Sequence, residues 1–163
     1  MAKKLTAQTV ALCGMMAALI FIATYLLKIP VGNGYIHLGD GFILLSAAVL
    51  GWPAVLSAAV GSMLADLLAG YSVYMLPTFV IKAAVAAIAV LACAKKSQPM
   101  QMFTMLLAEI AMVAGYFVTD WVILGYGLAA ATAAVLGNVL QGLSGVAVWM
   151  LLMPVVKRIR KQA

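Results

Sequence analysis

Residues 77–94, "PTFVIKAAVAAIAVLACA", form an apolar run that contains one charged side chain, Lys82. A helix of about 20 mostly apolar residues spans the hydrocarbon core of a bilayer, so this run is long enough to cross a membrane. The whole chain has the same character, because 67% of its 163 residues are hydrophobic and 9% are charged. Soluble domains carry roughly 25% charged residues. The composition therefore indicates a membrane protein and excludes a soluble globular domain.

The apolar runs on either side divide at glycine, proline and polar residues into six expected helices. Their ranges are 5–27, 40–51, 54–69, 77–94, 100–124 and 128–153. The second run is short for a full span, so it either crosses with support from its flanks or forms a tight hairpin with the third. We expect an all-α, polytopic membrane protein with six transmembrane helices in a single membrane-embedded domain, residues 1–163.

The basic residues lie in small clusters at the ends of the apolar runs. With six spans, eight of the ten fall on the side of the termini: Lys3, Lys4, Lys95, Lys96, Lys157, Arg158, Arg160 and Lys161. Basic loops face the cytoplasm, so this distribution predicts an N-in, C-in orientation. The same distribution explains the net charge of +6. A nucleic-acid-binding protein would be expected to carry its basic residues along one helix face, which is not the pattern here.

Several ionisable residues are expected at one depth. A helix advances ~1.5 Å per residue, which places Asp66, Lys82 and Asp120 a few residues below the outer ends of their helices, near His37 and Asp40. Each charge in a span costs roughly 2.5–3.5 kcal/mol, so their gathering indicates a shared polar site. Two other interpretations stay open. Asp66 could simply pair with Lys82, and Asp40 could cap a helix with His37 as its partner or with His37 in solvent.

Two later helices add polar faces to this region. Glu109, Tyr116 and Asp120 lie along one stripe of the expected helix 100–124. Asn138 and Gln141 share a small, polar face of the helix 128–153. Helix packing accounts for the small residues of that face, while Asn138 is placed to line the floor of a cavity. For Glu109 a structural role and ligand contact both stay open.

Aromatic side chains gather at the same end of the expected helices. Tyr35, Tyr71 and Tyr74 lie in or beside outer loops with glycines, where rings can stack on a flat ligand and a loop can close over it. Tyr126 is better explained by an interfacial aromatic belt, and Trp121 fits either role. We expect an outward-opening pocket for a small, water-soluble, aromatic or heterocyclic molecule. The predicted substrate-binding residues are Tyr35, His37, Asp40, Asp66, Tyr71, Tyr74, Lys82, Tyr116, Asp120 and Asn138.

The sequence lacks the motifs of several other functions. It has no G-x-x-x-x-G-K-[ST] phosphate loop and no dinucleotide fingerprint, so we expect no cofactor on this chain and no ATP hydrolysis by it. Neither Cys13 nor Cys93 is followed or preceded by a second Cys or a His at ligand spacing, so no metal site is expected. A G-x-S-x-G elbow is also missing, and we expect no catalytic residues. The alternatives are a small intramembrane enzyme using His37 with Asp40, and a ligand-free structural membrane protein.

A strip of small residues follows one face of the first expected helix. Its members, at spacings of four, three and four, are Ala7, Ala11, Gly14 and Ala18. Small residues let helices approach closely, so another helix is expected to dock on this strip. That helix belongs either to this chain or to a second subunit.

Three stretches, "GYIHLGDGFILLSAAVLG" (34–51), "GSMLADLLAGYSVYMLPTFVIKA" (61–83) and "GNVLQG" (137–142), resemble the S components of energy-coupling-factor (ECF) vitamin transporters. The similarity is greatest to the riboflavin-type branch, which also includes proteins assigned to hydroxymethylpyrimidine or pyridoxine. It implies a six-helix protein of the prokaryotic plasma membrane that binds a vitamin from outside. It also implies two kinds of partner, a transmembrane coupling subunit and two ATPase subunits that use ATP.

The resemblance also bears on particular residues. The family contacts its coupling subunit through an A-x-x-x-A pattern, which Ala7 and Ala11 match, whereas the deeper pair here is Gly14 and Ala18. The nickel and cobalt branch carries a histidine after the initiator methionine, where this chain has Ala2, so a metal substrate is not expected. Among vitamins we expect pyridoxine or hydroxymethylpyrimidine before riboflavin, because the short chain and modest aromatic content suit a single-ring ligand.

Overall fold

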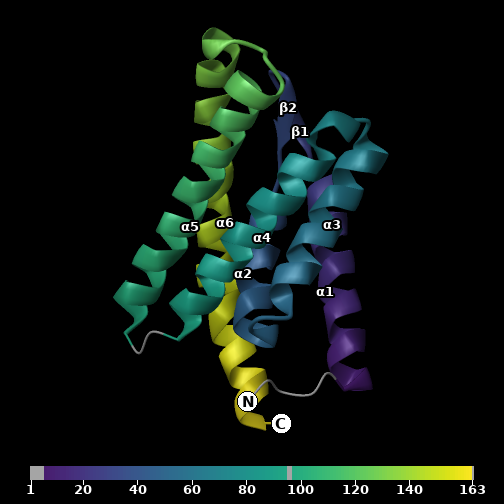
Figure 1. The fold of residues 1–163 in the computed structure, drawn as a ribbon. Helices are drawn as coiled ribbons and strands as arrows, with labels where there is room; N and C mark the ends of the chain where they lie inside the picture. Colours follow the sequence, from purple (N-terminus) through teal and green to yellow (C-terminus); the bar gives the residue numbers. More distant parts are fainter. Residues whose placement is uncertain (1–5, 95–96, 163) are drawn as a thin grey trace.

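The computed structural model describes residues 6–94 and 97–162, and in it the six predicted apolar runs are helices (Figure 1). These are α1 (Ala7–Tyr25), α2 (Gly39–Leu50), α3 (Ala54–Ala69), α4 (Met75–Cys93), α5 (Gln98–Val118) and α6 (Leu128–Gln162). A 3₁₀ turn, η1 (Ser72–Tyr74), precedes α4, and a π-helical turn, η2 (Thr119–Ile123), extends α5. The prediction of an all-helical protein built on six helices is confirmed.

The sequence prediction missed a short antiparallel β-hairpin between α1 and α2. It consists of β1 (Ile29–Val31) and β2 (Gly34–Ile36), with Pro30 paired to Tyr35. Gly32 supports the turn with a φ of 57°, a left-handed conformation that glycine adopts without strain.

Four helical segments are long and apolar enough to cross a membrane: Ala7–Tyr25, Ser72–Cys93, Gln98–Ile123 and Leu128–Arg158. The other two, α2 and α3, have 12 and 16 residues. At ~1.5 Å per residue, α2 is shorter than the hydrocarbon core. Six complete crossings therefore remain a prediction, as does the orientation, for which Lys3, Lys4, Lys95 and Lys96 lie outside the described residues.

The helices run side by side, so the molecule has two ends (Figure 1). The β-hairpin, the α3–α4 connection and the α5–α6 connection lie together at one end, which we call the hairpin end. The beginning of α1 and the end of α6 lie at the opposite end. This arrangement brings segments from across the whole sequence together at the hairpin end.

Small residues allow the helices to pack at close range. A Cβ added to Gly61 of α3 would collide with the carbonyl group of Ala17 in α1, so these two backbones are in direct contact. The Ser57 hydroxyl donates a hydrogen bond to the Cys13 carbonyl oxygen across the same interface, at 3.0 Å. At the interface between α6 and α2, Gly145 of α6 packs directly against the backbone and Cβ of Asp40.

The small-residue strip of α1 points away from these contacts. All four of its residues, Ala7, Ala11, Gly14 and Ala18, are exposed, and no atom lies within 4 Å of a Cβ placed on Gly14. None of the described helices covers the strip, because α1 packs on α3 through its other face. The interpretation that the strip serves a helix of this chain is therefore wrong for the part of the chain that the structure describes.

Candidate ligand-binding site

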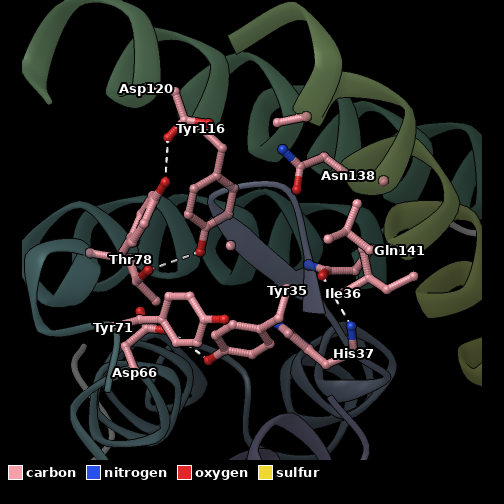
Figure 2. A pocket seen from close by; sticks show the side chains of 15 residues that line it. Tyr35, Ile36, His37, Asp66, Tyr71, Thr78, Tyr116, Asp120, Asn138 and Gln141 are labelled. Carbon is pink, nitrogen blue, oxygen red and sulfur yellow. Dashed lines mark hydrogen bonds between the residues drawn. The ribbon is translucent and has the colours of Figure 1, made fainter. Parts of the chain in front are cut away.

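A cavity lies at the hairpin end, between the β-hairpin and the ends of α3, α4, α5 and α6 (Figure 2). Its volume is about 50 Å³. A water molecule needs roughly 10–15 Å³ of such space, so the cavity in this conformation has room for only a few waters. It is lined by Val31, Gly34, Tyr35, Ile36, His37, Asp66, Tyr71, Tyr74, Thr78, Tyr116, Asp120, Ala134, Gly137, Asn138 and Gln141.

Eight of the ten side chains predicted to bind a substrate line this one cavity. They are Tyr35, His37, Asp66, Tyr71, Tyr74, Tyr116, Asp120 and Asn138. They come from both halves of the chain, and Figure 2 shows the labelled members arranged around a common space. Their convergence is a finding of the structure, and their contact with a ligand stays a prediction.

Asp40 and Lys82 are the two predicted residues that the structure places elsewhere. The Lys82 ammonium donates to both carboxylate oxygens of Asp40, at 2.6 and 2.9 Å, and both side chains are completely buried. The alternative pairing of Lys82 with Asp66 is therefore wrong. So is the helix-cap role of Asp40, since Leu38 occupies that position and Asp40 lies in the first turn of α2. A charge buried away from water needs a partner, and here α2 and α4 supply one each.

Gln141 connects this ion pair to the cavity wall. Its amide nitrogen donates to Asp40 Oδ2 at 2.6 Å, and its amide oxygen accepts a hydrogen bond from the backbone N–H of His37 at 3.2 Å. Both ends of the Gln141 amide are thereby used within the protein. The sequence marked Gln141 as polar but gave no sign that it would bridge α2 and the segment before it.

His37 is a buried, neutral donor at the edge of the cavity. It is 7% exposed, which excludes the interpretation of a solvated loop residue. Its Nδ1 accepts a hydrogen bond from the Gly39 N–H at 3.0 Å, so the ring proton resides on Nε2. Burial lowers the pKa of His37 to about 3; the nearby Asp40 carboxylate opposes this shift and the Lys82 ammonium adds to it. The ring is therefore uncharged at neutral pH.

Two carboxyl groups of the cavity wall accept hydrogen bonds from tyrosines. The Tyr35 hydroxyl donates to Asp66 Oδ1 at 2.6 Å, and the Tyr74 hydroxyl donates to Asp120 Oδ1 at 2.7 Å. Burial and the adjacent Asp66 raise the pKa of Tyr35 above its ordinary value, so this phenol keeps its proton and acts as a donor. Both pairs join a turn or strand at the hairpin end to a neighbouring helical segment.

A row of tilted tyrosine rings accompanies these pairs. The centroids of Tyr35 and Tyr71 lie 4.8 Å apart, and Tyr74 lies 6.5 Å from Tyr71 and 6.4 Å from Tyr116. These separations are typical of favourable aromatic contacts. Tyr126 also contacts Tyr74 but is 41% exposed and outside the cavity lining, as an interfacial position requires.

Other residues of the lining were not predicted. Thr78 forms a hydrogen bond of 3.0 Å with the Tyr116 hydroxyl, and Val31 and Ile36 reach the cavity from the hairpin against Gly137. The segment "IPVGNGYI" carried a signal for this hairpin, because a turn containing Asn-Gly separates two short apolar stretches.

Glu109 lies outside the lining of this cavity. It is 4% exposed, packs against Gly142, and neither of its oxygens has a hydrogen-bond partner among the described residues. Its position outside the lining separates it from a ligand in this cavity, and a structural role for it stays a prediction.

Comparisons with known proteins agree on one family. A family model described as "ECF-type riboflavin transporter, S component" matches residues 4–160. A solved structure of the S component of a bacterial ECF transporter superposes with a TM-score of 0.77 at 20% sequence identity, over 94% of this chain and 98% of that one. At this identity the likeness shows the fold. A search of curated proteins finds no match.

Proposed function

Because the chain belongs to the S-component family of ECF-type riboflavin transporters, we propose that it captures a small, water-soluble B-group vitamin or precursor for import. The family consists of transport proteins, so the chain is a multi-pass membrane protein and not an enzyme. The geometry agrees, because His37 Nδ1 accepts from the Gly39 N–H and Asp40 is bound by Lys82, so these two side chains do not form a catalytic pair with each other.

The convergence of eight predicted polar and aromatic side chains on one cavity carries this proposal. Tyrosine rings offer stacking surfaces for a flat heterocycle, while carboxyl and amide groups offer hydrogen bonds to its ring nitrogens and hydroxyls. Concave sites with a few convergent polar groups are typical of small-molecule binding.

Within this class we propose pyridoxine or hydroxymethylpyrimidine first and riboflavin second. A cavity of about 50 Å³ has to expand for any vitamin, and a single ring requires less expansion than three fused rings. Movement of the β-hairpin is the simplest route to that expansion, since Val31, Tyr35 and Ile36 form part of the wall. The name of the matching family keeps riboflavin as the second candidate.

We further propose that the hairpin end faces the outside of a prokaryotic plasma membrane, with both termini in the cytoplasm. This orientation places the cavity where a vitamin arrives. The exposed strip Ala7, Ala11, Gly14 and Ala18 is then the surface for a transmembrane coupling subunit, which two ATPase subunits drive with ATP. The remaining apolar surface contacts membrane lipid, and no nucleic acid takes part.

The test is calorimetric titration of the detergent-purified protein with pyridoxine, hydroxymethylpyrimidine and riboflavin. We expect saturable binding of at least one, and a loss of at least about fivefold in affinity in Tyr71→Ala, because stacking contacts contribute about 1–3 kcal/mol per ring. Trp121→Ala is the matched control, since this ring is 47% exposed and lies outside the cavity lining.

Two results would contradict the proposal. Folded protein that binds no member of the panel would instead support the ligand-free structural alternative. An equal loss of affinity in Trp121→Ala and Tyr71→Ala would place the ligand elsewhere.

A further inference from the structure

The cavity wall carries two acidic side chains. Asp66 and Asp120 line it, and no lysine or arginine does so in the part of the chain that the structure describes. The nearest buried cation is the Lys82 ammonium, 5.3 Å from the centroid of the Tyr116 ring, and it is held by both oxygens of Asp40. His37 is neutral. The wall thus presents two acidic groups without a basic one.

Asp66 has hydrogen-bonding capacity that the protein does not fill. The residue is 5% exposed, and its Oδ1 accepts from Tyr35. Its Oδ2 is buried and has no hydrogen-bond partner of ordinary geometry among the described residues, although the Thr78 hydroxyl lies near enough to the carboxyl group to stabilise its charged form. An unpaired buried carboxyl oxygen is unfavourable, so such an atom in a cavity wall marks a place where a ligand donor would be stabilised.

The aromatic part of the wall favours the same kind of ligand. The faces of tyrosine rings carry negative partial charge and attract cations within about 6 Å. Tyr35 and Tyr71, whose centroids are 4.8 Å apart, stand next to Asp66 through the Tyr35 hydroxyl. Rings beside an acidic group form the type of site that recognises organic cations.

We propose that the cavity selects a flat organic cation, a ring compound with a protonated or quaternary nitrogen that faces Asp66 Oδ2 while its ring contacts Tyr71. This inference rests on the proposed function and narrows its substrate class. It also predicts discrimination against phosphorylated forms of the same vitamin, since a phosphate adds about −1.5 to −2 charges opposite two acidic groups and no cation.

Matched ligands test the charge preference on the unmodified protein. Pyridoxamine, which carries a protonated amine, is titrated against pyridoxine, which has no net charge, and against pyridoxamine 5′-phosphate. Hydrogen bonds to charged groups exceed neutral ones enough to predict at least a tenfold preference for pyridoxamine over each of the other two. Riboflavin is added as a larger, uncharged ligand.

Variants locate the preference in the protein. Asp66→Asn should lower pyridoxamine affinity at least tenfold and change pyridoxine affinity less than threefold, and Asp120→Asn provides a second variant if the first does not fold. Glu109→Gln is the matched control, because it removes a buried carboxyl group outside the cavity and should leave the ratio unchanged.

The outcomes separate the two proposals. Uncharged or phosphorylated vitamins that bind as tightly as pyridoxamine would overturn the cation inference and leave the vitamin-binding proposal standing. A preference that survives in the aspartate variant that folds would also overturn it. Folded protein that binds no vitamin at all would overturn the proposed function and this inference with it.

Discussion

Replacing Lys82 with methionine should destabilise the protein strongly and affect ligand binding little. The side chain is 0% exposed, and its ammonium is bonded to both oxygens of Asp40. Methionine fills a similar volume but leaves the Asp40 carboxylate buried with Gln141 as its remaining donor. Breaking a buried ion pair by removing one partner lowers the free energy of unfolding by about 3–5 kcal/mol. At roughly 2–4 °C per kcal/mol for a chain of this size, the unfolding temperature should fall by about 6–20 °C.

A second replacement shows whether the loss comes from the lone charge. Asp40→Asn alone should also destabilise, because it leaves the Lys82 ammonium without its anion. The double variant Lys82→Met with Asp40→Asn removes both charges and keeps a polar group near Gln141. We expect it to be more stable than the sum of the single losses by about 2 kcal/mol or more, since neutral replacement of a buried ion pair is often tolerated.

The assay is thermal unfolding of the purified variants in one detergent, with calorimetric vitamin titration well below the unfolding temperature. Lys28→Met is the matched control, because this lysine lies in the loop at the hairpin end and bonds only locally, to the Tyr25 carbonyl oxygen and ring. Its stability should change by less than about 1 kcal/mol. The reasoning is refuted if Lys82→Met loses under 1 kcal/mol of stability but at least tenfold in affinity, since Lys82 would then serve the ligand.

Three further predictions concern separate parts of the fold. Because the pKa of His37 is lowered to about 3, the unfolded state takes up a proton that the folded state does not take up as the pH falls from about 6.5 to 3. The free energy of unfolding should therefore decrease by up to about 1.4 kcal/mol for each pH unit of acidification in this window. Thermal unfolding of His37→Gln should show a flatter pH profile. Gly61→Ala should destabilise the protein through its clash with the α1 backbone, whereas Gly14→Ala, in open space, should be neutral or stabilising by about 0.5–1 kcal/mol; a shared outcome in the same melts would count against the contact. Ala11→Leu should abolish co-purification with the coupling subunit, while Ala133→Leu on an exposed face of α6 should not, and an equal effect of both would remove the strip from the interface.

The helices were predictable because each long apolar run has few other ways to satisfy its backbone in a membrane. The β-hairpin was missed because strands of three residues such as Ile29–Val31 are too short to show an alternating pattern, so only the glycine-rich turn between them signalled it. Its position nevertheless follows from the helices. The end of α1 and the beginning of α2 lie toward the same end of the molecule, so the residues that connect them lie there too.

The sequence predicted the depth of the site's side chains along the helices, but not the rotation of each helix about its axis. Counting residues from the ends of the helices placed Asp40, Asp66 and Lys82 at similar heights, and the structure brings all three to the hairpin half of the molecule. Which carboxylate meets Lys82 depends on the rotation of α4 about its axis and on how closely α6 approaches α2. Gly145 permits that approach, and no property of the sequence near Lys82 reveals it.

The pairing of Lys82 with Asp40 determines the electrostatics of the cavity above it. Had Lys82 met Asp66, the wall would contain a neutralised pair and a single remaining acid. Because α2 supplies Asp40 instead, the Lys82 ammonium is used within the fold, and Gln141 is used with it. Asp66 and Asp120 are left with tyrosine hydroxyls, which stabilise a carboxylate but do not cancel its charge. A cationic ligand in the cavity would supply a positive charge that the described side chains of the wall do not carry.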